Sequence, residues 1–414
     1  MGIPYYVASL LKTHKHIQTK CGNAPLKVDV LGIDFNCFIH TYLKAENPIG
    51  SIVIALHELL TMTVHANNVY IAFDGLVPYG KIVQQRYRRM RKGEVEGFDK
   101  HQISPGTPFM KDLADTLRFM YPEYVISDTL EPGEGEHKIF TWLRTIPDSA
   151  RRNICIYGLD ADLVLISLAQ NHLGKIELLR ELPNGGFSTL SVNALASVLP
   201  IEKDIFVQMS IMSFGNDFMP NLAMFSLRED GYARGLFYAT RDDAHAAELK
   251  TLLKRAKEHD RRILAVDGRA LESRFGCQLM DGVINWEPVC YAFWKTYEWT
   301  YHYFTTSEVL DWEWYYPYAE APLLSTIEEF ERPKTFVWEH PTPILTVEDQ
   351  LRFILPAHSL KKAGLEPIYP DELYDEATET RHPWMKRFAW ECDPWISLPR
   401  GTLTSVTRFV PQQS

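Results

Sequence analysis

Two glutamates stand two residues apart in the stretch EPGEGEHKIF (131–140), directly after a Pro-Gly pair. Glu134 and Glu136 open a segment with the pattern of an amphipathic helix. Acids in a first helical turn are common, because the helix dipole favours them by roughly 0.3–1 kcal/mol. Side chains two residues apart do not face each other in regular helix. The two carboxylates can therefore converge only if the glycine-rich segment 132–135 is not yet helical, or if one acts through a water molecule.

Further acids follow short apolar runs that have the length of buried strands. Asp34 ends the run VDVLGID, Asp74 ends NVYIAFD, and Asp160 and Asp162 close NICIYGLDAD. Asp217 follows a helical run and a Gly-Asn turn in SFGNDFMP. A single Asp after a strand is commonly a helix cap or a turn residue. Capping does not, however, require every strand of one sheet to bring an acid to the same edge.

Acids placed in this way predict a metal site. Magnesium prefers carboxylate oxygens and water as ligands, and no His/Cys set in the chain suits zinc. Two such ions, about 3.5–4 Å apart, support the in-line attack of water on a phosphodiester. Bound cations would also admit a polyanionic substrate despite the net charge of −10. The hypothesis takes seven residues as catalytic metal ligands: Asp34, Asp74, Glu134, Glu136, Asp160, Asp162 and Asp217.

A basic run, KIVQQRYRRMRK (81–92), begins close after Asp74 and carries six basic residues in twelve. Such a run is often no more than a solvated helix face. A face with this composition beside a metal cluster suits the capture of a terminal phosphate by charge-assisted hydrogen bonds. On a helix, one continuous face would contain Lys81, Gln85, Arg88, Arg89 and Lys92.

Aromatic side chains offer a place for a nucleic-acid base. His40 follows Asp34 closely, and Trp312 and Trp314 belong to the stretch DWEWYYPYAEAP (311–322). Stacking on an aromatic face contributes roughly 1–3 kcal/mol per base and tolerates any base. A tryptophan-rich stretch is also typical of plain core packing, so that alternative stays open.

Strand-like runs alternate with helical patterns over the first 230 residues, at 28–35, 68–75, 123–128, 153–160 and 175–181. This alternation predicts an α/β fold with a mostly parallel sheet and helices on both faces. Ligands of such sheets bind at the carboxyl ends of the strands. We expect three parts: an α/β domain at 1–230 with the metal site, a helical connector at 231–282, and a smaller aromatic-rich domain at 283–414 that closes over the site.

The composition is that of an ordinary globular protein, with 46% hydrophobic and 23% charged residues. No apolar run approaches the roughly 18 residues that cross a bilayer, so no membrane association is expected. Six cysteines without any CxxC pair argue against disulfides and thiolate zinc sites. The sequence therefore predicts an intracellular protein, cytoplasmic rather than nuclear.

The chain resembles the Xrn/Rat family of eukaryotic 5′→3′ exoribonucleases, which is related to the flap endonucleases. The resemblance implies a PIN/flap-nuclease-like fold, the seven acids as ligands of two Mg²⁺ ions, and tolerance of Mn²⁺. The small size of the chain favours a streamlined member of the family, of viral or parasite type. The motifs that carry the resemblance are MGIP, LGIDFNCFIH, IAFDGLVPYGKIVQQRYRRMR, ISPGTPFM, EPGEGEHKI, YGLDADL, GNDFMP, WEWYYPY and YPDELYDE.

The resemblance also implies residue roles and an activity. The activity would be processive hydrolysis of single-stranded RNA from a 5′-monophosphate end to nucleoside 5′-monophosphates. Two alternatives remain: a flap-type, structure-specific DNA endonuclease with the same metal acids, and a catalytically weak RNA-binding protein. The implied roles are 5′-phosphate binding for Lys81, Gln85, Arg88 and Arg89, and stacking on the first base for His40 with either Trp312 or Trp314.

Overall fold

The centre of the computed structural model is a seven-stranded mixed sheet, in the order β1-β11-β10-β9-β3-β5-β8. Neighbouring strands from β10 to β8 are parallel, and β11 pairs antiparallel with both β10 and β1. The strands are β1 (Gln18–Lys20), β3 (Val30–Asp34), β5 (Val69–Ala72), β8 (Val125–Ser127), β9 (Asn153–Tyr157), β10 (Lys175–Glu181) and β11 (Phe187–Ser191). The structure describes residues 2–368, apart from 23, 44–45, 65–67, 91–93, 96–97, 183, 228–229, 241–278, 281–282 and 319–320.

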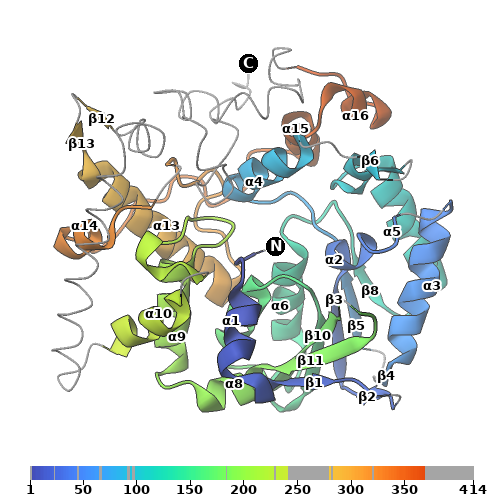
Figure 1. Ribbon diagram of the computed structural model, residues 1–414. Helices are drawn as coiled ribbons and strands as arrows, with labels where there is room; N and C mark the ends of the chain where they lie inside the picture. Colours follow the sequence, from blue (N-terminus) through green and yellow to red (C-terminus); the bar gives the residue numbers. More distant parts are fainter. Residues whose placement is uncertain are drawn as a thin grey trace.

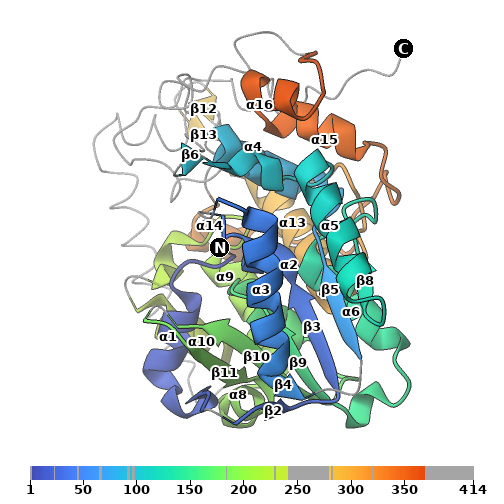
Figure 2. The same ribbon diagram turned by 90° about the vertical axis from the view of Figure 1, so that its right-hand side faces the viewer.

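Helices cover both faces of this sheet (Figures 1 and 2). Alternate residues of a strand point to opposite faces, so Ile154 and Ile156 enter one core while Cys155 and Tyr157 enter the other. The first core contains residues of α6 (Gly135–Thr145), α7 (Asp162–Leu168), α9 (Lys203–Phe214) and α13 (Trp286–Thr306). The second contains residues of α2 (Phe35–Ile39), α3 (Pro48–Thr61) and α5 (Pro108–Met120).

The five predicted strands are all present, each within or close to its expected range. Every residue of β3 is buried, as expected for a strand inside a parallel sheet that is covered on both faces. The sequence analysis missed β1 and β11. The first has only three residues, Gln-Thr-Lys, and the second, Phe-Ser-Thr-Leu-Ser, has no continuous apolar run.

A third, smaller core joins α4 (Tyr79–Met90) to α15 (Val347–Ile354) and α16 (Ala357–Lys362). Its members include Val77 and Ile82 on one side and Leu351 and Ile354 on the other. In both views α4 lies above the carboxyl ends of the central strands (Figures 1 and 2). The basic helix is thereby brought over the edge where the acids are expected.

The aromatic-rich helix α13 contributes Trp299, Tyr303 and Phe304 to the same core as Ile139 and Phe140 of α6. The described part of the predicted connector includes α10 (Gly231–Thr240) and β12 (Leu279–Met280), and its residues 241–278 lie outside the described residues. In the predicted aromatic-rich domain, residues 369–414 also lie outside the described residues. Among the described helices, none combines the length and the apolar character needed to span a membrane.

The remaining elements are short. They are α1 (Tyr6–Thr13), α8 (Val192–Val198), α14 (Leu324–Glu329), β2 (Leu26–Lys27), β4 (Thr63–Val64), β6 (Glu94–Val95), β7 (Phe98–Asp99) and β13 (Val283–Ile284), with 3₁₀ turns η1 (Lys15–Ile17), η2 (Lys100–Ile103), η3 (Ser149–Arg151) and η4 (Ala223–Phe225).

Candidate metal centre

Asp34 and Asp74 lie at the ends of two central strands, at one edge of the sheet. Each carboxylate also accepts a hydrogen bond from a backbone N–H in the first turn of a helix. Asp34 accepts hydrogen bonds from the backbone N–H of Cys37 at 3.5 Å and from its thiol at 2.8 Å. Asp74 accepts from the backbone N–H of Gly135 at 2.8 Å and from the side-chain amide of Asn36 at 3.1 Å. Helix capping thus fixes these two carboxylates next to each other, and the capping explanation and the metal hypothesis are compatible.

Glu134 and Glu136 converge because helix α6 begins only at Gly135. Glu134 has extended backbone angles, φ −77° and ψ 149°, as predicted for a turn that is not yet helical. Gly133 before it has φ 115°, which other residues rarely adopt. The turn is fastened to the loop behind β5 by two backbone hydrogen bonds, Gly75 N–H to Gly133 O at 2.9 Å and Gly133 N–H to Leu76 O at 2.7 Å.

One half of the acid cluster brings several buried or half-buried carboxylates close together. Oxygens of Asp34, Asp74 and Glu136 lie within 4.8 Å of one another. Oδ1 of Asp162 is buried and has no hydrogen-bond partner within the described part of the chain. Burial, together with the neighbouring Asp74, raises the pKa of Asp34 to about 7. Burial, together with the neighbouring Asp160, raises the pKa of Asp162 to about 7 as well. Buried, mutually repelling oxygens of this kind fit a divalent cation.

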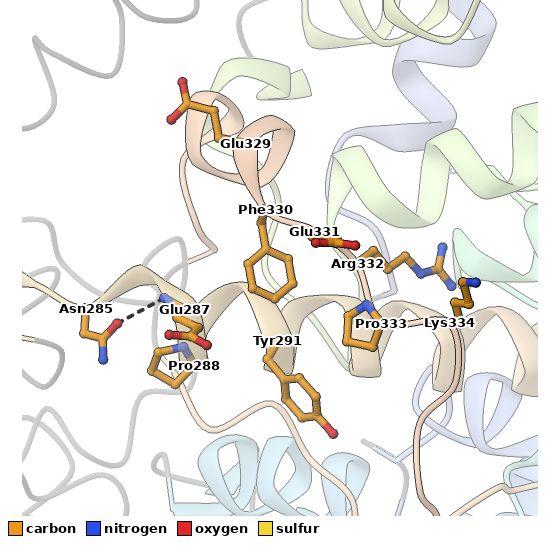
Figure 3. Close-up of a pocket in the computed structure, with 10 residues that line it drawn as sticks. All are labelled: Asn285, Glu287, Pro288, Tyr291, Glu329, Phe330, Glu331, Arg332, Pro333 and Lys334. Atoms are coloured by element: carbon orange, nitrogen blue, oxygen red, sulfur yellow. Dashed lines mark hydrogen bonds between the residues drawn. The ribbon is translucent and has the colours of Figure 1, made fainter.

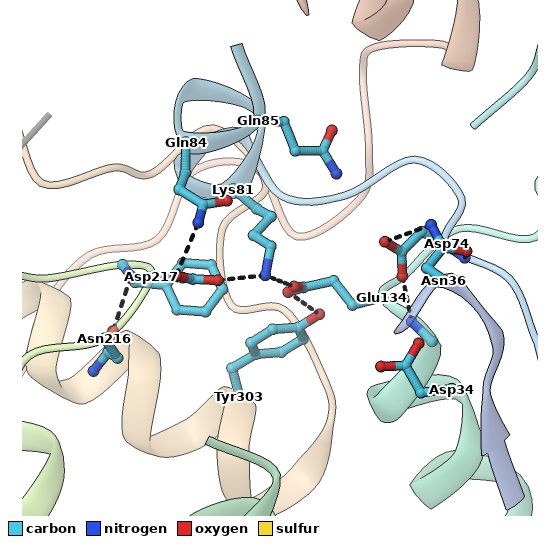
Figure 4. A network of polar contacts seen from close by, with 12 residues as sticks. Asp34, Asn36, Asp74, Lys81, Gln84, Gln85, Glu134, Asn216, Asp217 and Tyr303 are labelled. Atoms are coloured by element: carbon cyan, nitrogen blue, oxygen red, sulfur yellow. Dashed lines mark hydrogen bonds and ion pairs between the residues drawn. The ribbon is translucent and has the colours of Figure 1, made fainter. Parts of the chain in front are cut away.

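In the other half, Lys81 forms ion pairs with two carboxylates (Figure 4). Its ammonium nitrogen lies 2.5 Å from Oε2 of Glu134 and 2.6 Å from Oδ2 of Asp217. The second oxygens are also bound, because Tyr303 donates to Oε1 of Glu134 at 3.2 Å and Gln84 donates to Oδ1 of Asp217 at 3.0 Å. Burial by itself would raise the pKa of Asp217, but nearby positive charge, with Lys81 the largest contributor, lowers the pKa below its ordinary value.

The residues of the predicted phosphate-binding face of α4 therefore differ in their burial and in their hydrogen-bond partners. Gln85 is buried, and its Oε1 accepts from the side-chain amide of Gln350 at 3.4 Å. Arg89 is half-buried, and its Nε donates to Oγ of Ser104 at 2.9 Å. The side chain of Arg88 lies outside the described residues.

The candidate stacking residues have different surroundings. His40 is exposed at the C-terminal end of α2. Trp312 lines a hollow of about 670 Å³ between α6 and the segment after α13. Trp314 is held in place, because its indole N–H donates to Oγ1 of Thr296 at 3.0 Å and the ammonium of Lys295 lies 4.2 Å from its ring centre.

A second hollow, of about 850 Å³, lies at the opposite end of α13 (Figure 3). Tyr291, Phe330 and Arg332 are among the residues that line it. The start of α13 is roughly 26 Å from Tyr303 along the helix axis, so this hollow is separate from the acid cluster.

The sequence analysis missed two residues of the centre, Gln84 and Tyr303. Gln84 stands beside Gln85, about 100° away around the helix, so the pattern that selected Gln85 for the phosphate-binding face did not include Gln84, which binds Asp217. Tyr303 belongs to a run of aromatic residues, in which no spacing separates a packing residue from one that binds an acid.

Comparisons with known proteins identify the family to which the chain belongs. A model described as the XRN 5′-3′ exonuclease N-terminus matches residues 1–96 and 92–182, and the Xrn1 helical domain matches residues 238–388. The chain is 31% identical over 219 residues to the 5′-3′ exoribonuclease 2 of Eremothecium gossypii, covering 40% of this chain and 23% of that protein. It is 26% identical over 307 residues to the 5′-3′ exoribonuclease 1 of Saccharomyces cerevisiae, covering 56% and 20%. The matches thus span about a fifth of these relatives.

Solved structures with similar architecture include the catalytic core of Rad2 in complex with a DNA substrate. The TM-score is 0.42 at 14% identity, covering 90% of this chain and 98% of that one. Flap endonuclease-1 from Methanococcus jannaschii has a TM-score of 0.34 at 14% identity, covering 56% and 80%. Similarity at this level says nothing about the substrate.

Proposed function

Because the chain belongs to the Xrn family of 5′–3′ exonucleases, we propose that it is a metal-dependent 5′→3′ exoribonuclease. Its substrate would be single-stranded RNA with a 5′-monophosphate, which it would degrade processively to nucleoside 5′-monophosphates. One observation carries the proposal: the first basic residue of α4, Lys81, lies inside an acid cluster at the carboxyl edge of the sheet. The helix proposed to bind the phosphate is thereby in direct contact with the acids proposed to bind the metal.

The acids are the groups that would hold Mg²⁺, two ions in this proposal. Divalent cations supply the activation of water and the stabilisation of the leaving 3′-oxygen. The chain itself contributes the arrangement of the carboxylates. Strand ends fix Asp34 and Asp74, the turn before α6 fixes Glu134, and Asp162 presents a buried oxygen to which none of the described residues donates a hydrogen bond.

Recognition of the 5′ end would come from Lys81, Gln85, Arg88 and Arg89 on α4. Guanidinium groups bind phosphate oxygens bidentately and keep their charge at any working pH. A 5′-hydroxyl or a cap would not provide these oxygens. His40 and either Trp312 or Trp314 would stack on the first base, which tolerates every sequence but requires an unpaired strand.

The proposal is tested with one RNA sequence that carries a 5′-phosphate, a 5′-hydroxyl or a cap. We expect fast release of mononucleotides from the 5′-phosphate form alone, and no cleavage in EDTA. Arg88→Ala should reduce the preference for the phosphate, whereas Arg118→Ala, on the exposed surface of α5, should leave it unchanged. Equal rates on all three ends, or cleavage of a DNA flap at its junction, would favour the endonuclease instead.

A further inference from the structure

Tyr303 connects helix α13 to the acid cluster. Its hydroxyl donates to Oε1 of Glu134 at 3.2 Å, while the ammonium of Lys81 lies 2.5 Å from Oε2 (Figure 4). Both oxygens of this carboxylate therefore have a partner, one on α13 and one on α4. A carboxylate bound at both oxygens cannot rotate freely, so its orientation depends on where α13 lies.

The ring of Tyr303 is packed against the neighbours of two acids. It is 1% exposed and stacks on His137, the residue after Glu136, with 3.6 Å between ring centres. Phe218, the residue after Asp217, packs edge-on against it at 5.7 Å. The hydroxyl thus belongs to a ring that is held in place by helix α6 and by the loop after α9.

The C-terminal end of α13 is held by side chains of the sheet-covering helices. Arg144 of α6 donates to the carbonyl oxygens of Thr305 and Thr306. The side-chain amide of Gln170 donates to the carbonyl oxygen of Phe304 at 3.3 Å. These carbonyls have no partner within the helix itself. Their capture prevents α13 from sliding along its axis and keeps the hydroxyl of Tyr303 within reach of Glu134.

We infer that Tyr303 is a positioning residue for the metal centre, through which α13 sets the affinity of the acids for a divalent cation. The inference rests on the proposed role of Glu134 as a metal ligand. Groups that orient metal ligands typically change metal affinity by roughly 10–100-fold when they are removed. The substitution Tyr303→Phe removes the hydroxyl and keeps the ring.

The test measures Mn²⁺ binding without RNA, from the electron paramagnetic resonance signal of free Mn²⁺. We expect Tyr303→Phe to bind Mn²⁺ roughly 10-fold more weakly than the unmodified protein. A matched control is Tyr157→Phe, because Tyr157 is also buried and donates to a glutamate, Glu181, at 2.7 Å outside the acid cluster. Unchanged affinity in Tyr303→Phe would overturn the inference.

A double-mutant cycle separates orientation of Glu134 from a general loss of structure. In a Glu134→Gln background, Tyr303→Phe should have no further effect on Mn²⁺ binding; an equal loss there would also overturn the inference. Because no RNA is present, the result is independent of exonuclease activity. A protein that binds Mn²⁺ but leaves every RNA intact would contradict the proposed function alone.

Discussion

Lys81 supplies the buried positive charge that pairs with two acids of the metal centre. Its side chain is 7% exposed, and those of Glu134 and Asp217 are 3% and 1% exposed. Removing one partner of a buried ion pair typically costs about 3–5 kcal/mol, because the remaining charge has no compensation. We predict a loss of that size for Lys81→Met in urea unfolding of the metal-free protein.

A second substitution tests the cause of that loss. Asp217→Asn in the Lys81→Met chain should recover part of the stability, since one uncompensated carboxylate is gone. For comparison, Lys111→Met removes an exposed pair with Asp115 and should cost less than about 1 kcal/mol. A loss in Lys81→Met no larger than that of Lys111→Met would exclude the buried pair.

Asp162 gives the centre a dependence on pH. Its pKa is about 7 in the folded chain, against an ordinary value of 3.8. A raised carboxyl pKa stabilises the fold fully below the unfolded value, and this contribution is lost as the pH rises through about 7. We predict that thermal unfolding in EDTA moves to lower temperature between about pH 4 and pH 7. Asp162→Asn cannot ionise and should lose less stability over the same interval. Parallel curves for the two proteins would contradict the raised pKa.

At the scale of elements, α15 holds the basic helix against the loop behind Asp74. Gln350 is fully buried; its side-chain oxygen accepts from the N–H of Val77 at 3.0 Å, and its amide donates to Gly75 O and to Gln85, both at 3.4 Å. Replacing it by leucine leaves the N–H of Val77 without a partner, which costs about 1–3 kcal/mol.

We predict that Gln350→Leu lowers the preference for 5′-phosphate RNA while Mn²⁺ binding stays near that of the unmodified protein. The reason is that the substitution loosens Gln85 on α4 but touches none of the acids. The readout is the ratio of degradation rates on 5′-phosphate and 5′-hydroxyl RNA. Gln18→Leu, on the sheet edge with Ser188 as its partner, is the control. An unchanged rate ratio in Gln350→Leu would rule out this role of α15.

The elements were more predictable than the contacts between them. Apolar runs identified the five central strands, and the rule that parallel strands end at one edge placed Asp34 and Asp74 together before any coordinates. The turn before α6 followed from its glycines. Two kinds of contact depend on how α4 and α13 pack against the sheet. They are the ion pairs of Lys81 with Glu134 and Asp217, and the hydrogen bond from Tyr303 to Glu134. No local pattern contains that information, because it is set by packing between distant segments.

For the whole molecule, a single buried cluster extends from the sheet to α13. It includes Ile154 and Ile156 of β9, Phe140 of α6 and Trp299 of α13. The acid cluster contacts α13 through Tyr303 and α4 through Lys81. A helix that begins at residue 286 is in this way part of a site whose first acid is residue 34.

Trp299 offers a test of this shared packing. It is 1% exposed, its indole N–H donates to the carbonyl of Asp311 at 2.9 Å, and its ring packs on Phe218 and Tyr303. Truncating a buried tryptophan to alanine costs about 3–5 kcal/mol. If α13 and the sheet unfold together, Trp299→Ala should lower the midpoint of one transition seen both by circular dichroism and by Mn²⁺ release. The contrary result would be two separate transitions, with Mn²⁺ released at the midpoint of the unmodified protein. It would mean that α13 unfolds without disturbing the acids, and that the packing of α13 does not stabilise the acid cluster.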